Sequence, residues 1–131
     1  MNVGFTGTQR GISPERLDEL RNLLAHLRER GFDTLHHGDC VGADAQAHEA
    51  ALKLGYRIWL HPPMDDKKRA HCTDAHFTSE LRTYRARNHK IVRYTAILIA
   101  APRGSEKSQP YSGTWMTVRM ARKAGKEIFF I

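Results

Sequence analysis

The sequence predicts an α/β fold, a Rossmann-like open parallel sheet of about five strands with helices on both faces. Apolar runs of strand character alternate with amphipathic helical segments along the whole chain, as in parallel sheets. The run from Thr95 to Ala101 is apolar without alternation, which is typical of a strand covered on both faces. Three of the loops that enter strands are short and hold one glycine each, whereas loops leaving the strands are long and polar. We therefore expect the functional chemistry at the carboxyl edge of the sheet, where open α/β sheets bind ligands.

Each predicted element has a local signal. The first helix begins at Ser13-Pro14-Glu15 and keeps its leucines on one face, and the second is rich in alanine, which lets it lie close to a sheet. Gly31, Gly55 and Gly125 follow basic helix ends and suit the left-handed position after a helix. We expect strands at 2–6, 32–37, 56–60, 95–101 and 127–131, and helices at 14–30, 43–54, 78–93 and 113–124.

The length of 131 residues suits one domain, 1–131, which can bury a core without staples. Cys40 and Cys72 are too few and too far apart for a disulfide framework or a CxxC zinc site, which fits a reducing compartment. Without a leader or an apolar run of membrane-spanning length, we expect a soluble cytoplasmic protein with no membrane partner. The formal net charge of +7 favours an anionic partner, either a nucleotide or nucleic acid, or serves solubility alone.

The loop after the first strand has the composition of a phosphate-binding turn. Its glycines let the backbone approach a ligand, Thr6 and Thr8 offer hydroxyls, and the N–H groups before the next helix attract anions. Arg10 adds a fixed positive charge with several donors. Because the loop is neither GxGxxG nor GxxxxGK[ST], the predicted phosphate site at Thr6, Gly7, Thr8 and Arg10 depends on where the other loops lie.

A second glycine turn, from Gly38 to Gly42, opens the helix at 43–54. Asp44 in the first turn of that helix either contacts a ligand or only complements the helix dipole. Asp39 either caps the helix or accepts ribose hydroxyls. His48 lies one helical turn beyond Asp44 on the same face, either packed or catalytic.

Arg87 and Asn88 lie within the predicted helix 78–93. Asparagine is a poor helix former, so its position indicates a specific role, such as a bond to a neighbouring loop backbone. The cations of this helix form either a solvated face or a nucleic-acid groove, and few aromatic residues lie between them.

The stretch Ser112-Gly113-Thr114 repeats the pattern of glycine between hydroxyls at the start of a helix. Ser112 is either a simple N-cap or part of a second phosphate cradle. A switch point between the first and fourth strands would bring this turn opposite the first loop.

The two longest loops, 61–77 and 102–112, are expected to act as lids. The first contains metal-competent side chains, but their spacing matches no common zinc pattern, so we predict neither a metal site nor a resident cofactor. These side chains are His61, His71, Cys72, Asp74 and His76. His36 and His37 either titrate near the ligand or pack.

Taken together, these motifs resemble those of the SLOG superfamily, the Rossmann-like group that includes DprA and the LOG phosphoribohydrolases, and the resemblance covers nearly the whole chain. The GxxxGxDxxAHxxAL motif of the DprA branch is similar to residues 38–52, apart from the register of one alanine. Arg87-Asn88 resembles the RN motif of the family, and Ser112-Gly113-Thr114 its SGS/SGT turn. The opening GTR loop resembles residues 7–10 with one residue inserted.

The resemblance implies a site for nucleotides or nucleotide-derived ligands and assembly as a homodimer or higher homo-oligomer. LOG enzymes remove a base from a nucleoside monophosphate using a PGGxGTxxE motif. This chain has Tyr111-Ser112 in place of the proline-glycine pair and Thr117 at the position of the catalytic glutamate. Cleavage of a glycosidic bond needs an acid or base near the anomeric carbon, so an enzymatic role would need Asp39, Asp44 or Glu80 as a substitute.

Three hypotheses follow. The first is a nucleotide-binding domain that senses or sequesters its ligand, the second a nucleotide hydrolase that cleaves an N-glycosidic or phosphoester bond with Asp44 or Asp39 as general base, and the third a single-stranded nucleic-acid binder using the basic helix. The predicted ligand-binding residues are Thr6, Gly7, Thr8, Arg10, Gly38, Asp39, Gly42, Asp44, Arg87, Asn88, Ser112, Gly113 and Thr114.

Overall fold

The computed structural model, which describes residues 1–104 and 112–131, confirms the α/β fold with a parallel sheet. The sheet has six strands rather than about five, in the order β4-β3-β2-β1-β5-β6, and all neighbouring strands are parallel. The strands are β1 (Asn2–Gly7), β2 (Thr34–His37), β3 (Arg57–Leu60), β4 (Phe77–Thr78), β5 (Ile97–Ala101) and β6 (Glu127–Phe130).

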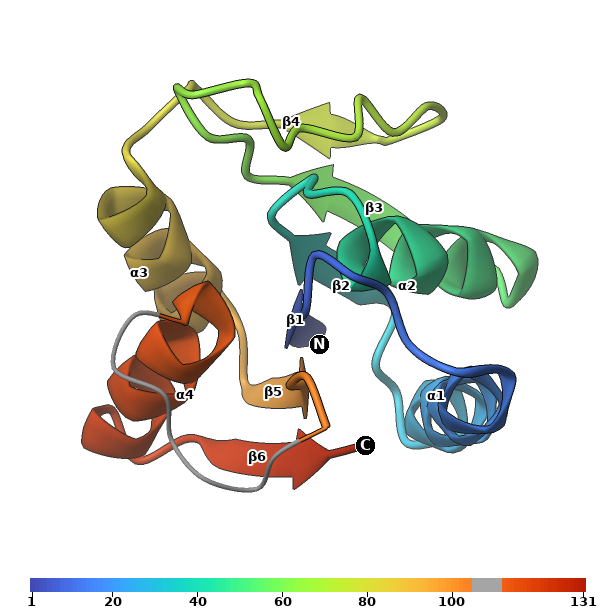
Figure 1. Ribbon diagram of the computed structural model, residues 1–131. Helices are drawn as coiled ribbons and strands as arrows, with labels where there is room; N and C mark the ends of the chain where they lie inside the picture. The colour runs from blue at the N-terminus through green and yellow to red at the C-terminus, as the bar shows by residue number, and fades with distance from the viewer. Residues whose placement is uncertain (105–111) are drawn as a thin grey trace.

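Four helices cover the sheet, with α1 and α2 on one face and α3 and α4 on the other (Figure 1). They are α1 (Pro14–Glu29), α2 (Ala43–Lys53), α3 (Tyr84–Tyr94) and α4 (Gly113–Lys123). The predicted helix starts at Pro14, Ala43 and Gly113 are therefore correct. Among the helices of the described residues, none combines the length and apolar composition that a membrane crossing requires.

Each face of the sheet has its own apolar core. Under α1 and α2, Phe5 of β1 packs with the leucines of α1 and the alanines of α2. The small alanine side chains let α2 lie close to the strands, as its composition predicted. Under α3 and α4, Leu98 of β5 packs with Ile91, Trp115 and Val118. Since β5 contributes to both cores, its lack of alternation is explained.

The predicted helix 78–93 was wrong at its start. Thr78 pairs with Leu60 in the short edge strand β4, and the Ser79 N–H donates to the Leu60 oxygen at 2.9 Å. The helix begins only after Thr83, whose hydroxyl accepts from the Ala86 N–H at 3.2 Å. Apolar periodicity did not reveal this N-cap, because a capping threonine interrupts no hydrophobic pattern.

The chain reverses its direction of progress across the sheet at β1. Strands β2, β3 and β4 extend on one side of β1, and β5 and β6 on the other. The predicted switch point, between the first strand and the strand at 95–101, therefore lies at β1 and β5. Most of the second predicted lid loop, residues 105–111, lies outside the described residues; this segment includes Tyr111.

Candidate functional site

A cavity of about 420 Å³ lies at this switch point, at the carboxyl ends of the strands. Its walls come from the loop after β1, the turn after β2, the first half of α3 and the start of α4. All the predicted ligand-binding residues except Asp39 and Gly42 line it. The cavity walls also include Phe5, Gln9, Cys40, Tyr84, Ile91, Arg103 and Met116, which the sequence analysis did not single out as ligand contacts.

Main-chain hydrogen bonds join the loop after β1 to β5 and to α2. The Thr8 N–H donates to the Ala101 oxygen at 3.0 Å, and the Thr8 oxygen accepts from the Ala43 N–H at 2.9 Å. A Cβ at Gly7 would lie 2.5 Å from that of Ala43, too close for any other residue. Gly42 has a φ of 86° and would collide with the Gln9 oxygen if it carried a side chain. Gly42 does not line the cavity, but its lack of a side chain lets the loop after β1 lie close to the start of α2.

The start of α4 forms the opposite wall. The Ser112 hydroxyl accepts from the Trp115 N–H at 3.3 Å, so Ser112 is an N-cap, one of the two roles that its position allowed. A Cβ added at Gly113 would meet no atom of the described residues within 4 Å, and Thr114 is buried. The positive end of the α4 dipole therefore faces the cavity, with Arg10 and Arg103 also on its walls.

Asp44 is the only carboxylate among the described residues that line the cavity. Its Oδ2 accepts from the backbone N–H groups of Gly38 and Cys40, each at 3.2 Å, which closes the turn after β2. Its Oδ1 is buried and has no hydrogen-bond partner in the described residues. Burial raises the pKa of Asp44 to about 6, although the nearby Arg87 acts in the opposite direction.

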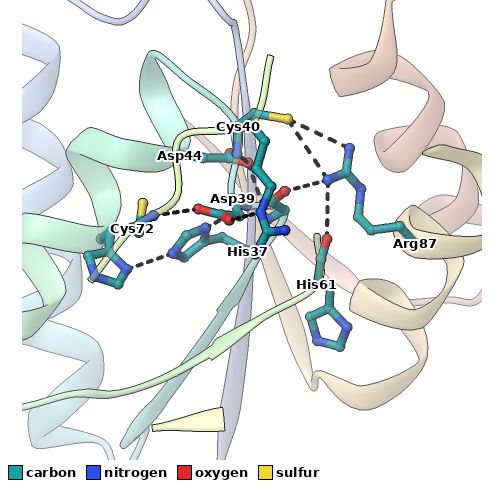
Figure 2. Close-up of polar contacts among 10 residues, drawn as sticks. His37, Asp39, Cys40, Asp44, His61, Cys72 and Arg87 are labelled. Atoms are coloured by element: carbon teal, nitrogen blue, oxygen red, sulfur yellow. Dashed lines mark hydrogen bonds and ion pairs between the residues drawn. The ribbon is translucent and has the colours of Figure 1, made fainter. Parts of the chain in front are cut away.

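Arg87 ties three elements together (Figure 2). Its Nη1 donates to the Gly38 oxygen at 2.5 Å and to the His61 oxygen at 3.2 Å, and its Nε donates to the Asn88 Oδ1 at 2.6 Å. The guanidinium is buried, and a Cβ at Gly38 would collide with it. We expected Asn88 to bond a neighbouring loop backbone, but Arg87 makes those bonds, and Asn88 contacts Arg87 and Met116 instead.

The carboxylate of Asp39 lies away from the cavity. Its Oδ2 accepts from Arg69 Nε at 2.8 Å and its Oδ1 from the Cys72 N–H at 2.9 Å. Asp39 is fully buried with a φ of 56° and anchors the loop 61–77 rather than capping α2. With both oxygens engaged there, the Asp39 carboxylate does not line the cavity, so the structure does not place it for the suggested contact to ribose hydroxyls or for a role as general base. The positive φ turns this side chain away from the cavity, which the pattern GDC did not reveal.

His48 is buried among its neighbours and does not line the cavity. The Asp39 N–H donates to His37 Nδ1 at 3.0 Å, so neutral His37 carries its proton on Nε2. That atom lies 2.9 Å from His48 Nδ1, and His48 Nε2 lies 2.6 Å from the Thr73 oxygen. The two rings thus form a buried chain of hydrogen bonds from β2 through α2 to the loop 61–77, in which every ring nitrogen has a partner.

His37, His48 and Cys72 bring three potential metal-ligand atoms within 4.8 Å of one another. The donor set is a poor fit for a metal. His37 Nε2 bears the proton that binds His48, and burial holds the pKa of His37 well below its ordinary value. Burial and the neighbouring Asp39 raise the pKa of the Cys72 thiol to about 12, so the thiolate that a metal requires is disfavoured.

No protein-family model matches the chain. Three solved structures resemble it over 98% of its length. The molybdenum cofactor binding protein from Rippkaea orientalis has a TM-score of 0.71 and 21% identity, with 74% of that chain covered. The molybdenum cofactor carrier protein from Chlamydomonas reinhardtii has a TM-score of 0.70 and 20% identity, also with 74% covered. DNA processing protein A (DprA) from Streptococcus pneumoniae has a TM-score of 0.67 and 17% identity, and the chain spans 49% of it.

The chain shares the overall fold of these three proteins. Thr117, which the sequence resemblance sets at the position of the LOG catalytic glutamate, is fully buried, and its hydroxyl donates to the Gly113 oxygen at 3.0 Å. One curated protein also matches in sequence: the phosphoglycerate kinase of Porphyromonas gingivalis is 42% identical over 55 residues, 41% of this chain. The match covers only 13% of the kinase, so kinase chemistry is not carried over.

Proposed function

We propose that the protein binds a nucleotide or nucleotide-derived ligand in the cavity and acts as a sensor or sequestering protein. The observation that carries the proposal is the pairing of two anion-attracting features across one cavity: the loop after β1 with Arg10, and the N-terminus of α4 with Ser112 and Gly113. Backbone N–H groups, a helix dipole and a guanidinium together suit phosphate. Two of the structural neighbours are named for binding or carrying a cofactor, which supports a binding role.

The carboxylates that line the cavity indicate whether the protein is a binding protein or a hydrolase. Hydrolysis of a glycosidic bond generally uses a pair of carboxyl groups, one as acid and one as base or nucleophile. Asp44 is the single carboxylate among the described lining residues, and its Oδ2 is held by two backbone N–H groups. Asp39 is engaged with the loop 61–77. A binding protein is therefore favoured over a hydrolase.

Native mass spectrometry tests this proposal directly. The protein is incubated with nucleoside mono-, di- and triphosphates, dinucleotides and cyclic dinucleotides, and spectra report both adduct mass and subunit number. We expect one intact ligand per subunit of a homodimer or higher oligomer. Arg10→Ala should weaken the adduct about ten- to a hundredfold, because a charge-assisted hydrogen bond is lost.

The matched control is Arg21→Ala, which removes an exposed arginine of α1 that pairs with Asp18 and is not a cavity-wall residue. It should bind like the wild type. A ligand that returns cleaved would replace the binding proposal by the enzyme one. No adduct with any nucleotide would remove the nucleotide site altogether.

A second candidate, single-stranded nucleic-acid binding, is favoured by a separate observation. Aromatic residues that are distant in sequence gather beside the basic helix α3: the ring centroids of Trp59 and Phe77 lie 5.0 Å apart, and those of Trp59 and Tyr94 6.1 Å apart. Arg57 lies over the Phe77 ring and Lys90 over the Tyr94 ring. Rings alternating with cations suit stacked bases and phosphates.

Fluorescence anisotropy with a labelled single-stranded oligonucleotide separates the two candidates. Binding on this aromatic and basic face should weaken steeply with added salt and with Lys90→Glu, yet be unaffected by Arg10→Ala. Binding that shows the reverse dependence would belong to the cavity, and absence of binding at low salt would eliminate this second candidate.

A further inference from the structure

The orientation of the Asn88 side-chain amide can be assigned from its partners. Asn88 is 4% exposed, and its Oδ1 accepts from Arg87 Nε at 2.6 Å. A guanidinium nitrogen can only donate, so the atom facing it must be the amide oxygen. The NH₂ group consequently points in the other direction, where its partner is the thioether sulfur of Met116 at 3.7 Å.

This NH₂ group is a buried donor that can form a further hydrogen bond. A thioether sulfur is a weak acceptor, and an amide nitrogen carries two protons. Asn88 and Met116 both line the cavity, so the weakly satisfied edge of the amide lies at its wall. A buried donor without a strong acceptor carries a desolvation cost that a ligand acceptor would remove.

The surroundings of Asn88 differ from the phosphate-attracting walls. Ile91 follows one turn later on α3, and Tyr84 precedes Asn88 by one turn on the same helix. Met116 lies one turn inside α4 from Ser112. These side chains give this part of the cavity an apolar wall of the kind that a heteroaromatic ring contacts.

We infer that Asn88 is a specificity-determining residue: its NH₂ group donates a hydrogen bond to a carbonyl oxygen or ring nitrogen of the ligand's base, which packs against Ile91, Met116 and Tyr84. This inference rests on the proposed nucleotide-binding function. Because the amide oxygen is directed toward Arg87, the group that Asn88 directs toward the base is a donor. The site should therefore prefer a base edge that carries an acceptor over the same edge carrying an amino group.

The sharpest test is the Asn88→Asp variant, with affinities measured by isothermal titration calorimetry. Aspartate keeps an oxygen for Arg87 Nε and replaces only the cavity-facing NH₂ group by an oxygen, so the contact that holds the helix is preserved. Two ligand pairs differ by a carbonyl or an amino group at one position: UMP with CMP, and IMP with AMP. We expect the wild type to bind the carbonyl member of at least one pair about tenfold more tightly, and Asn88→Asp to reverse that preference.

The ratio within a pair is the readout, because the added negative charge weakens all four nucleotides alike. If the aspartate variant binds too weakly to measure, Asn88→Ala takes its place and should bring the ratio close to one. Equal affinities within both pairs for the wild type, or a ratio that neither variant changes, would overturn the inference; an Asn88 contact to phosphate would give this result. If the wild type binds none of the four nor any other nucleotide, the proposed function fails instead.

Discussion

The guanidinium of Arg87 donates from Nη1 to the main-chain oxygen of Gly38 at 2.5 Å, which joins α3 to the turn after β2. The same nitrogen reaches the His61 oxygen beyond β3. Two strand ends and one helix thus meet at a single buried side chain. The wall of the cavity depends on this junction, because Gly38, Arg87 and Asn88 all line it.

We predict that Arg87→Ala destabilises the protein by about 2–4 kcal/mol, because it leaves the oxygens of Gly38 and His61 buried without their donor. Urea unfolding followed by circular dichroism measures the change. Arg85→Ala, an exposed neighbour on the same helix, is the control and should change stability by less than about 0.5 kcal/mol. Equal effects of the two substitutions would contradict the structural role of Arg87.

Gly42→Ala should both destabilise the protein and weaken ligand binding. The new methyl group would collide with the Gln9 oxygen, at a φ of 86° that alanine adopts only with strain. Gly113→Ala is the matched comparison, since a Cβ there meets nothing within 4 Å among the residues that the structure describes. It should leave thermal stability unchanged or raise it by up to about 1 kcal/mol. The geometry is wrong if Gly42→Ala melts like the wild type.

Stability should fall as the pH falls below about 6.5. Burial lowers the pKa of His36 to about 4 and that of His61 to about 3, and it also lowers the pKa of His37. As the pH falls, the histidines of the unfolded chain take up protons before those of the folded protein. The stabilisation is therefore fully present above the ordinary histidine pKa and is lost as the pH falls toward the pKa values of the folded state. Each group contributes on the order of 1–2 kcal/mol between pH 7 and pH 5.

Urea unfolding at a series of pH values measures this loss. His36→Phe keeps a ring in the stack with Trp59, whose centroid lies 5.1 Å from that of His36, and removes one titrating group. The slope of stability against pH should be smaller in this variant. An unchanged slope would mean that His36 takes up no proton on unfolding.

Asp44 gives ligand affinity a pH dependence of its own. Its pKa is raised to about 6 by burial, and it lines the cavity that we propose to hold phosphate. Protonation removes a negative charge near the anion, so affinity should rise as the pH falls through about 6. Calorimetric titrations at pH 5 and pH 8 measure the effect.

Asp44→Asn is the control for that experiment. Its side-chain oxygen can still accept from the Gly38 and Cys40 N–H groups, so the turn should be kept. Binding should persist in this variant and lose the pH dependence attributed to Asp44. If product release is ever observed with the wild type, this substitution should stop it; persistence would exclude Asp44 as the base.

Local patterns in the sequence were enough to predict the fold and the edge of the sheet at which the cavity lies. Periodicity of apolar residues reports which face of a helix is buried, and it needs no knowledge of distant residues. The leucines of α1, the alanines of α2 and the apolar run of β5 all lie where their spacing indicated. The Ser112 cap was one of two roles that the sequence left open, and it could be named because capping depends on adjacent residues only.

Only the tertiary structure decided what individual polar side chains do. Asp39 and Asp44 have similar sequence surroundings, yet a positive φ turns Asp39 toward Arg69 while Asp44 closes the turn at the cavity. Arg85 and Arg87 are arginines two residues apart on the same helix, but Arg87 is buried against Gly38 and Arg85 is exposed. These directions follow from contacts between residues far apart in the chain. Such contacts leave no periodic trace in the sequence, because they depend on how the elements pack.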